Sequence, residues 1–107
     1  MVVDAGMNLG LFSLVLSRRW RGGSLTVLAF EPAEETYDLA LKNLQRHQVA
    51  VIDHGATVPE RLKVSEEGVL VHCFRLALGD RNGEEALCYF PYLTSSSTMS
   101  RHREVTC

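Results

Sequence analysis

The pattern of apolar and polar positions predicts strands and helices in alternation in the first part of the chain. The apolar run Met1–Asp4 predicts a short buried strand, and the β-branched run Leu25–Glu31 predicts a strand buried on both faces. Between them, Leu9–Trp20 predicts a helix with almost no polar face, which we expect to be largely covered. Residues Ala33–His47 predict a second helix, with acids in its first turn and bases in its last.

The rest of the chain has a less regular pattern. Residues 48–67 mix apolar residues with charges and turn formers, which indicates a long surface loop or insertion, with a short strand at Val49–Ile52 as an alternative. A further strand is predicted at Val69–Leu76. The Asn82–Gly83 pair then predicts a tight turn into a hairpin arm or a new strand. Residues 91–107 are polar and have no regular period, so we expect an irregular tail.

This order of elements predicts an α/β fold, because strands that alternate with helices form right-handed βαβ units and a parallel sheet. The length of 107 residues suits one small domain. We expect the strand order to begin 3-2-1, with a fourth strand pairing with the first.

Composition and charge limit the kinds of partner, compartment and metal site that we expect for this protein. A net charge of -2 and a pI of about 6.0 argue against nucleic acid or a membrane surface as a partner. Three cysteines without a C-x-x-C pair indicate a reducing compartment, and no apolar run approaches the ~20 residues of a membrane span. We therefore expect a cytoplasmic protein without a signal peptide. His72 and Cys73 would point to opposite faces of a strand, so we expect no metal site there.

The clearest candidate for chemistry is the glycine-containing turn between the first strand and the first helix. Backbone N–H groups at such a turn can approach a ligand closely. Gly6 leaves out the Cβ that would block this approach, Gly10 permits close packing of the helix on the strand, and Asp4 offers hydrogen-bond acceptors. The spacing alone is equally compatible with a plain strand-to-helix turn.

A second acid, Glu31, ends the next predicted strand. Neighbouring parallel strands bring their carboxyl ends side by side, so we expect Glu31 to lie beside the glycine turn. An acid at this place accepts hydrogen bonds from the ribose hydroxyls of an adenosine-containing cofactor. The alternative is that Glu31 caps the helix that follows it.

The residues of the turn favour one class of cofactor. Asn8 stands where the dinucleotide motif G-x-G-x-x-G has its middle glycine, and Leu11 and Phe12 stand where a P-loop has its Lys and Ser or Thr. The turn therefore favours a ligand without phosphates, such as S-adenosylmethionine, over NAD.

Three stretches, VVDAGMNLGLFSL, LAFEP and LALGDRNGE, resemble the FkbM-type S-adenosylmethionine-dependent methyltransferases. In that family the first stretch is the cofactor motif D-x-G-x-N-x-G, which Asp4, Gly6, Asn8 and Gly10 match. The resemblance implies a Rossmann-like three-layer methyltransferase fold, here truncated to parallel strands with two covering helices and a C-terminal hairpin.

The resemblance also implies roles for individual residues. Gly6 and its neighbours, Met7 included, would line the methionine moiety. Glu31 would bind the ribose, Pro32 would open the second helix, and Leu78 would lie near the adenine. The implied reaction is methyl transfer to a hydroxyl oxygen of a small molecule or glycan, and no residue of the chain is nominated as the base.

One motif of the family is missing from this sequence. The next strand of the family ends in an acidic D-x-E-G motif, and nothing after Met99 matches it. We therefore interpret residues 1–107 as one incomplete domain, the cofactor-binding part of a methyltransferase. Its first strand would have an open edge, which predicts self-association or a partner chain. The alternatives are a catalytically inactive remnant or interaction module that retains the turn and, less favoured, an NAD-dependent oxidoreductase.

Overall fold

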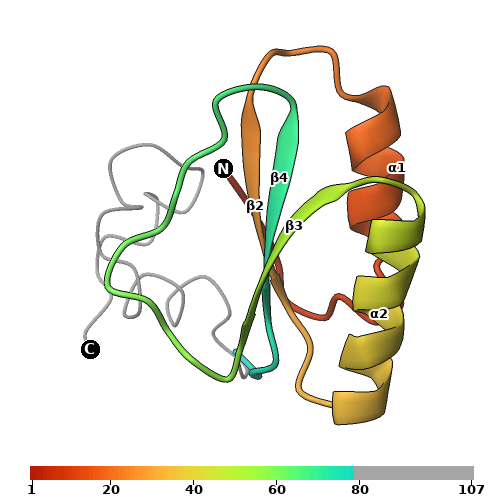
Figure 1. The fold of residues 1–107 in the computed structure, drawn as a ribbon, viewed down its shortest axis with the longest axis vertical. Coiled ribbons are helices and arrows are strands. Elements are labelled where there is room, and N and C mark those ends of the chain that lie inside the picture. Colours follow the sequence, from red (N-terminus) through yellow and green to blue (C-terminus); the bar gives the residue numbers. More distant parts are fainter. Residues whose placement is uncertain (79–107) are drawn as a thin grey trace.

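The computed structural model describes residues 1–78, which form a four-stranded parallel sheet with two helices (Figure 1). The elements in chain order are β1 (Val2–Asp4), α1 (Leu11–Arg19), β2 (Leu25–Phe30), α2 (Glu34–Arg46), β3 (Ala50–Gly55) and β4 (Val69–Phe74). The sheet order is β1-β2-β4-β3, and every pair is parallel. The predicted α/β class is confirmed, and so is the 3-2-1 order, because the third predicted strand is β4.

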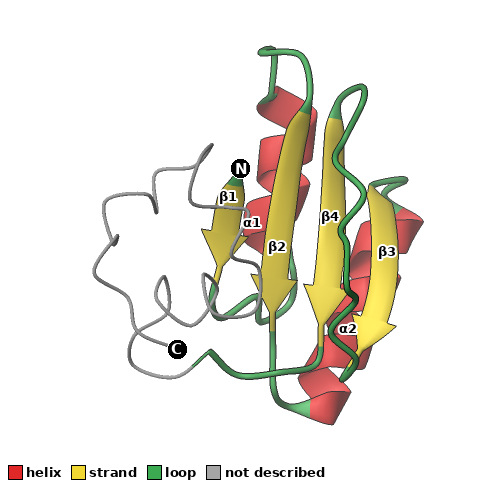
Figure 2. Cartoon of the chain, turned by 90° about the vertical axis from the view of Figure 1, so that its left-hand side faces the viewer, coloured by secondary structure: helices red, strands yellow, loops and turns green. Residues whose placement is uncertain are grey.

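The two helices cover the same face of the sheet, and the loop of residues 56–68 crosses the opposite face (Figures 1 and 2). Within residues 1–78, the sheet therefore lies between a helical layer and a loop layer. The predicted turn at Asn82–Gly83, the C-terminal hairpin and the tail of residues 91–107 lie outside the described residues.

Helix α2 is amphipathic, as its sequence pattern predicts. One face of the helix, at positions i, i+3, i+4 and i+7, is buried against the sheet and consists of Tyr37, Ala40, Leu41 and Leu44. Ala33 has an extended backbone and is the N-cap residue. Helix α2 therefore begins at Glu34, one residue later than predicted. The periodic apolar face is therefore sufficient to locate this helix and its buried side.

Helix α1 differs from the prediction that it is largely covered. Leu11, Phe12 and Val15 are 62%, 51% and 50% exposed, whereas Ser13 is fully buried. The helix turns a small residue toward the interior because a small side chain allows close approach, and this leaves larger apolar side chains outside. Its start also shifts from the predicted Leu9 to Leu11, because Gly10 has a positive φ of 83° that helical geometry does not allow.

Part of the predicted loop at residues 48–67 is strand β3, which pairs in parallel with β4. The strand is longer than the alternative considered from the sequence because its polar residues find partners. The Tyr37 hydroxyl donates to Asp53 Oδ1 at 2.5 Å, and the rings of His54 and His72 are joined by a 2.8 Å hydrogen bond. These hydrogen bonds stabilise β3 at the edge of the sheet, although its sequence has no clear alternation of apolar and polar residues.

The two faces of the sheet carry separate apolar clusters. On the helical side, β2 and β4 contribute Val27, Ala29 and Val71 to a cluster with α2. On the loop side, Phe30 and Phe74 stack with ring centroids 4.9 Å apart. The alternation of β2 side chains between these clusters explains why the strand is apolar at every position except Thr26, whose hydroxyl oxygen accepts the Ser65 amide hydrogen. None of the helices within residues 1–78 has the length and apolar character needed to cross a membrane.

Candidate functional site

The turn between β1 and α1 lies at the carboxyl end of β2 and is fastened to it. The Met7 amide donates to the Phe30 carbonyl at 2.7 Å, and the Gly10 amide donates back to the Met7 carbonyl at 2.9 Å. Asn8 has a φ of 52°, in the left-handed region that Asn tolerates better than most residues. The turn therefore has one defined backbone path.

Gly10 brings the turn against helix α2. A Cβ at this residue would lie 3.3 Å from Leu44 Cγ and 3.5 Å from the Ala40 carbonyl oxygen. The sequence predicted close packing of a helix on a strand here, and the structure corrects this, because the close neighbours of Gly10 belong to α2. Asn43 of the same helix donates from Nδ2 to the Leu9 carbonyl at 3.0 Å.

Glu31 lies beside the turn, as the topology predicts. Its Oε1 accepts the Asn8 amide hydrogen at 2.9 Å, and its Oε2 accepts the amide hydrogen of Ala33, the residue before α2, at 3.2 Å. The capping interpretation is therefore observed together with the predicted position beside the turn. Each carboxylate oxygen has more than one acceptor position, so both oxygens can still accept hydrogen bonds from a ligand.

Asp4 ends β1 next to the same turn, and one of its oxygens lacks a partner. Oδ2 is buried and accepts no hydrogen bond from the described part of the chain. Burial raises the pKa of this carboxyl, the negative charge of Glu31 raises it further, and the Gly6 amide acts in the opposite direction. Two carboxylates thus lie close enough to interact, and the site carries unbalanced negative charge.

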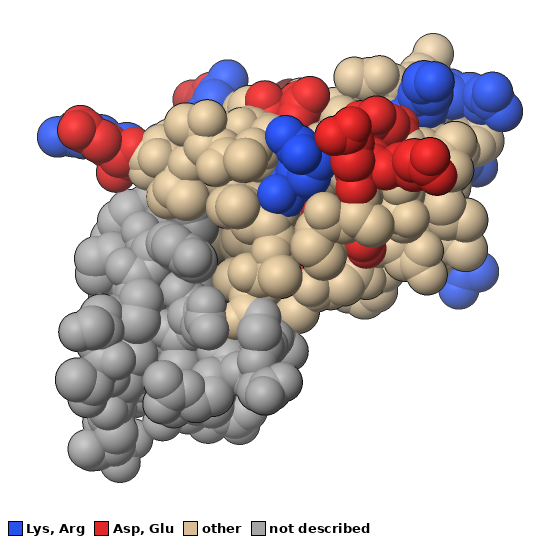
Figure 3. All heavy atoms as spheres, turned by 90° about the horizontal axis from the view of Figure 1, so that it is seen from below, with Lys and Arg blue, Asp and Glu red and all other residues tan. Residues whose placement is uncertain are grey.

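Acidic side chains also gather at the edge where the strands end (Figure 3). The first turn of α2 contributes Glu34 and Glu35. Arg75 offsets part of this charge, since its Nη1 lies 3.5 Å from Glu34 Oε1 in an exposed ion pair. The charge on this edge favours a ligand that carries positive charge near the turn.

Gly6 provides the open face of the turn. The residue is exposed, and a Cβ added to it would meet no atom of residues 1–78 within 4 Å. The space beside its Cα is therefore free for a ligand to approach the backbone. The structure brings together Asp4, Gly6, Asn8 and Glu31, four of the residues singled out from the sequence.

The other predicted site residues are placed differently. The side chains of Met7 and Leu78 are 3% and 1% exposed and belong to the two apolar clusters on opposite faces of the sheet. Met7 can therefore reach a ligand only through its backbone, and Leu78 has almost no free surface in this state. Pro32 is exposed just before α2. The cofactor contacts assigned to these residues stay predictions.

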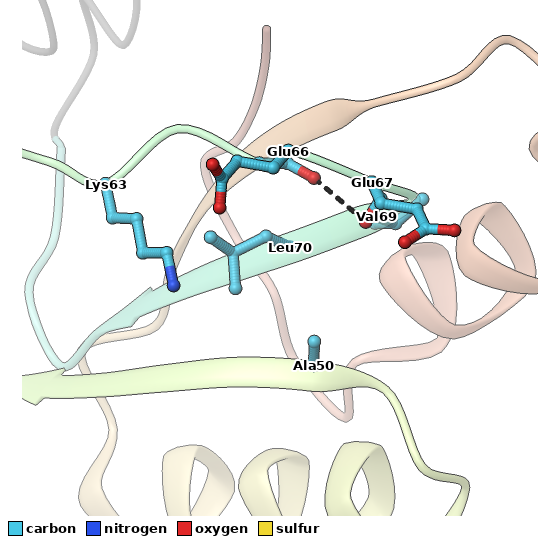
Figure 4. Close-up of a pocket in the computed structure, with 7 residues that line it drawn as sticks. Ala50, Lys63, Glu66, Glu67, Val69 and Leu70 are labelled. Carbon is cyan, nitrogen blue, oxygen red and sulfur yellow. Dashed lines mark hydrogen bonds between the residues drawn. The ribbon is translucent and has the colours of Figure 1, made fainter.

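A separate hollow of about 290 Å³ lies at the opposite edge of the sheet, near the amino ends of β3 and β4 (Figure 4). It is lined by Ala50, Lys63, Ser65, Glu66, Glu67, Val69 and Leu70. Lys63, Glu66 and Glu67 surround the apolar side chains of this hollow. None of the lining residues belongs to the turn between β1 and α1. Residues 1–78 hold no group of three or more His, Cys, Asp or Glu side chains suited to a metal ion.

Comparison with known proteins gives two curated relatives. The chain is 31% identical over 98 residues to "Methyltransferase 1" of Beauveria bassiana (strain ARSEF 2860), which covers 92% of this chain and 31% of that protein. It is 34% identical over 98 residues to "Methyltransferase sdnD" of Sordaria araneosa, with 92% and 30% covered. The chain thus spans about a third of the length of these relatives.

No protein-family model matches the chain, and no solved structure is significantly similar to it. The two matches nevertheless relate the chain to methyltransferases over nearly all of its length. Its α/β architecture is compatible with a truncated Rossmann-like methyltransferase fold.

Proposed function

We propose that this chain binds S-adenosylmethionine at the turn after β1 and is the cofactor-binding part of an FkbM-type methyltransferase. One observation carries the proposal. The carboxylates of Asp4 and Glu31 come from the ends of neighbouring strands and flank the open turn at Gly6. Asp4 Oδ2 is buried and has no hydrogen-bond partner within residues 1–78.

The charge of the site suits this cofactor. S-adenosylmethionine carries a sulfonium, an ammonium, a carboxylate and two ribose hydroxyls. It has no phosphate, so its net charge is positive. Among the described residues Asp4 Oδ2 has no donor, so a ligand ammonium that reached it would satisfy it. Glu31 has acceptor positions left for the ribose hydroxyls. A pyrophosphate would bring negative charge to two acids that already repel one another, which disfavours NAD.

The backbone of the site also suits a bound ligand. The absence of a Cβ at Gly6 leaves open space, and Asn8 and Gly10 hold left-handed conformations that define the path of the turn. Because the turn is fastened to β2 before any ligand binds, little ordering is required on binding.

When bound, the cofactor supplies an electrophilic methyl group for transfer to a nucleophile. The residues of this chain bind and orient it, which is the contribution that positioning makes to such a transfer. Methyltransferase activity is supported by the names of the two relatives. We propose a hydroxyl oxygen of a small molecule or glycan as the acceptor, and cytoplasm as the location.

The proposal is tested by calorimetric titration of the protein with S-adenosylhomocysteine and, separately, with NAD. We expect binding of the first and none of the second. Gly6→Ala should weaken binding at least tenfold, because its methyl group fills ligand space. Its unfolding temperature should stay near that of the wild type, since the added Cβ meets no atom of the described residues. Binding of NAD alone, or equal binding by Gly6→Ala, would overturn the proposal.

A methyl-transfer assay separates an enzyme from a binding module. Transfer of a labelled methyl group from S-adenosylmethionine to a hydroxyl-bearing acceptor supports the catalytic assignment. Cofactor binding without transfer to any acceptor tested would favour an inactive module that retains the turn.

A further inference from the structure

The carbonyl of Leu9 is a backbone acceptor that helix α1 leaves without a helical partner. The first carbonyl used by the helix is that of Gly10, which accepts the Leu14 amide hydrogen at 3.0 Å. Leu9 precedes it and lies outside the helical ladder, so its carbonyl needs a donor from elsewhere. Asn43 supplies that donor, with Nδ2 at 3.0 Å, although it lies 34 positions later in the chain.

This contact holds the turn from the side opposite β2. On the β2 side, the Phe30 carbonyl and the Glu31 carboxylate accept amide hydrogens of Met7 and Asn8. On the other side, α2 contributes the Asn43 amide and the packing surface under Gly10. A turn that contains a left-handed non-glycine residue keeps this conformation only where its surroundings hold it.

We propose that Asn43 is a positioning residue, which orients the ligand-binding turn through the Leu9 carbonyl. This inference rests on the function proposed above. Asn43 acts through the backbone of the turn, two residues from the point where Met7 is tied to β2. Helix α2 would thereby hold the part of the turn that follows Gly6, through the bond to Leu9 and the packing under Gly10.

The test compares two matched changes from an amide to a carboxylate on α2. Asn43→Asp removes the donor and presents acceptor oxygens to the Leu9 carbonyl, whereas Gln45→Glu adds the same charge at an exposed position of the helix. Each protein is titrated with S-adenosylhomocysteine below its unfolding temperature, and the exchange rate of the Asn8 amide hydrogen is measured without ligand. We expect Asn43→Asp to bind about tenfold more weakly and to exchange faster, and Gln45→Glu to stay within about twofold of wild type.

The outcomes separate this inference from the proposed function. If wild type binds and Asn43→Asp matches Gln45→Glu in affinity, Asn43 has a merely structural role and the inference is overturned. If wild type does not bind, the proposed function fails and the inference fails with it. If Asn43→Asp does not fold, Asn43→Ala carries the measurement, because it removes the donor without placing a charge beside the carbonyl.

Discussion

Glu31 and Asn8 lie 23 positions apart in the sequence, and a 2.9 Å hydrogen bond from the Asn8 amide to Glu31 Oε1 joins the turn after β1 to the residue that follows β2. The same carboxylate also accepts from Ala33. A single side chain thus fastens the glycine turn to the start of the second helix. Its structural and ligand-binding contributions can be measured separately.

Glu31→Ala should lower the free energy of unfolding by roughly 1 kcal/mol, because two partly exposed amide hydrogens lose their acceptor. It should also weaken S-adenosylhomocysteine binding more than tenfold, since the proposed ribose acceptors are gone. Urea unfolding and calorimetry measure the two effects. Glu35→Ala, an exposed acid in the first turn of α2, is the control. An affinity loss no larger than in this control would assign Glu31 to capping alone.

Asp4→Asn should stabilise the free protein at neutral pH and weaken the binding of a cationic ligand. The pKa of Asp4 is raised by burial, so its charged form is unfavourable in the folded state above that pKa, and the neutral amide removes this cost. We expect the free energy of unfolding at pH 7, measured by urea unfolding, to be higher than that of the wild type. The gain should shrink as the pH falls through the raised pKa. A destabilised Asp4→Asn protein at pH 7 would contradict this account.

Gly10→Ala should destabilise the protein more than Gly23→Ala. Both residues have a positive φ, of 83° and 92°, so both substitutions carry backbone strain of about 1–2 kcal/mol. Only the Cβ at residue 10 meets α2, at 3.3 Å from Leu44 Cγ, and this crowding adds roughly 1 kcal/mol. Thermal unfolding of the two variants gives the difference. Equal losses would show that α2 yields to the added methyl group.

The His54–His72 pair should make stability depend on pH. Burial lowers the pKa of both rings, and the charge of His72 lowers that of His54 further, while Asp53 and the Lys63 carbonyl act against these shifts. Both folded-state pKa values lie below the ordinary 6.5, so the unfolded chain takes up protons first. Stability should therefore be full above pH 6.5 and decrease as the pH falls below it.

Urea midpoints measured across this range test the prediction. His54→Phe removes one of the two imidazole rings but keeps an aromatic ring that can stack on Phe74. The urea midpoint of this variant should therefore vary less with pH than that of the wild type. A midpoint that rises on acidification would have the wrong sign for buried neutral histidines.

A protein that consists of residues 1–107 should self-associate. This follows from the open edge that the sequence predicts for the first strand, β1. Within the described residues, β1 is the outer strand of the sheet, and Leu11, Phe12 and Val15 of α1 are half exposed or more. Phe12→Lys should reduce the sedimenting mass of the assembled species. Leu39→Lys, at a similarly exposed apolar position on α2, should not. A wild-type chain that sediments as a monomer at high concentration would contradict the prediction.

Much of the fold follows from local patterns in the sequence. The spacing of Tyr37, Leu41 and Leu44 is enough to orient α2, and the predominantly apolar run of β2 indicates a strand covered on both faces. The position of Glu31 beside the turn also follows, because the carboxyl ends of neighbouring parallel strands must meet. These features depend on period and on chain direction, which are properties of the sequence itself.

Other features required the tertiary structure. An almost wholly apolar helix has no pattern that selects its buried side, so only packing could turn Ser13 inward and Phe12 outward. Strand β3 depends on partners for Asp53 and His54 that come from α2 and β4. The unpaired oxygen of Asp4 and the bond from Asn43 to Leu9 likewise arise only when distant segments meet. The sequence determines which hydrogen bonds and packing contacts each residue is able to make. The folded chain decides which of these contacts form, because the partners lie far apart in the sequence.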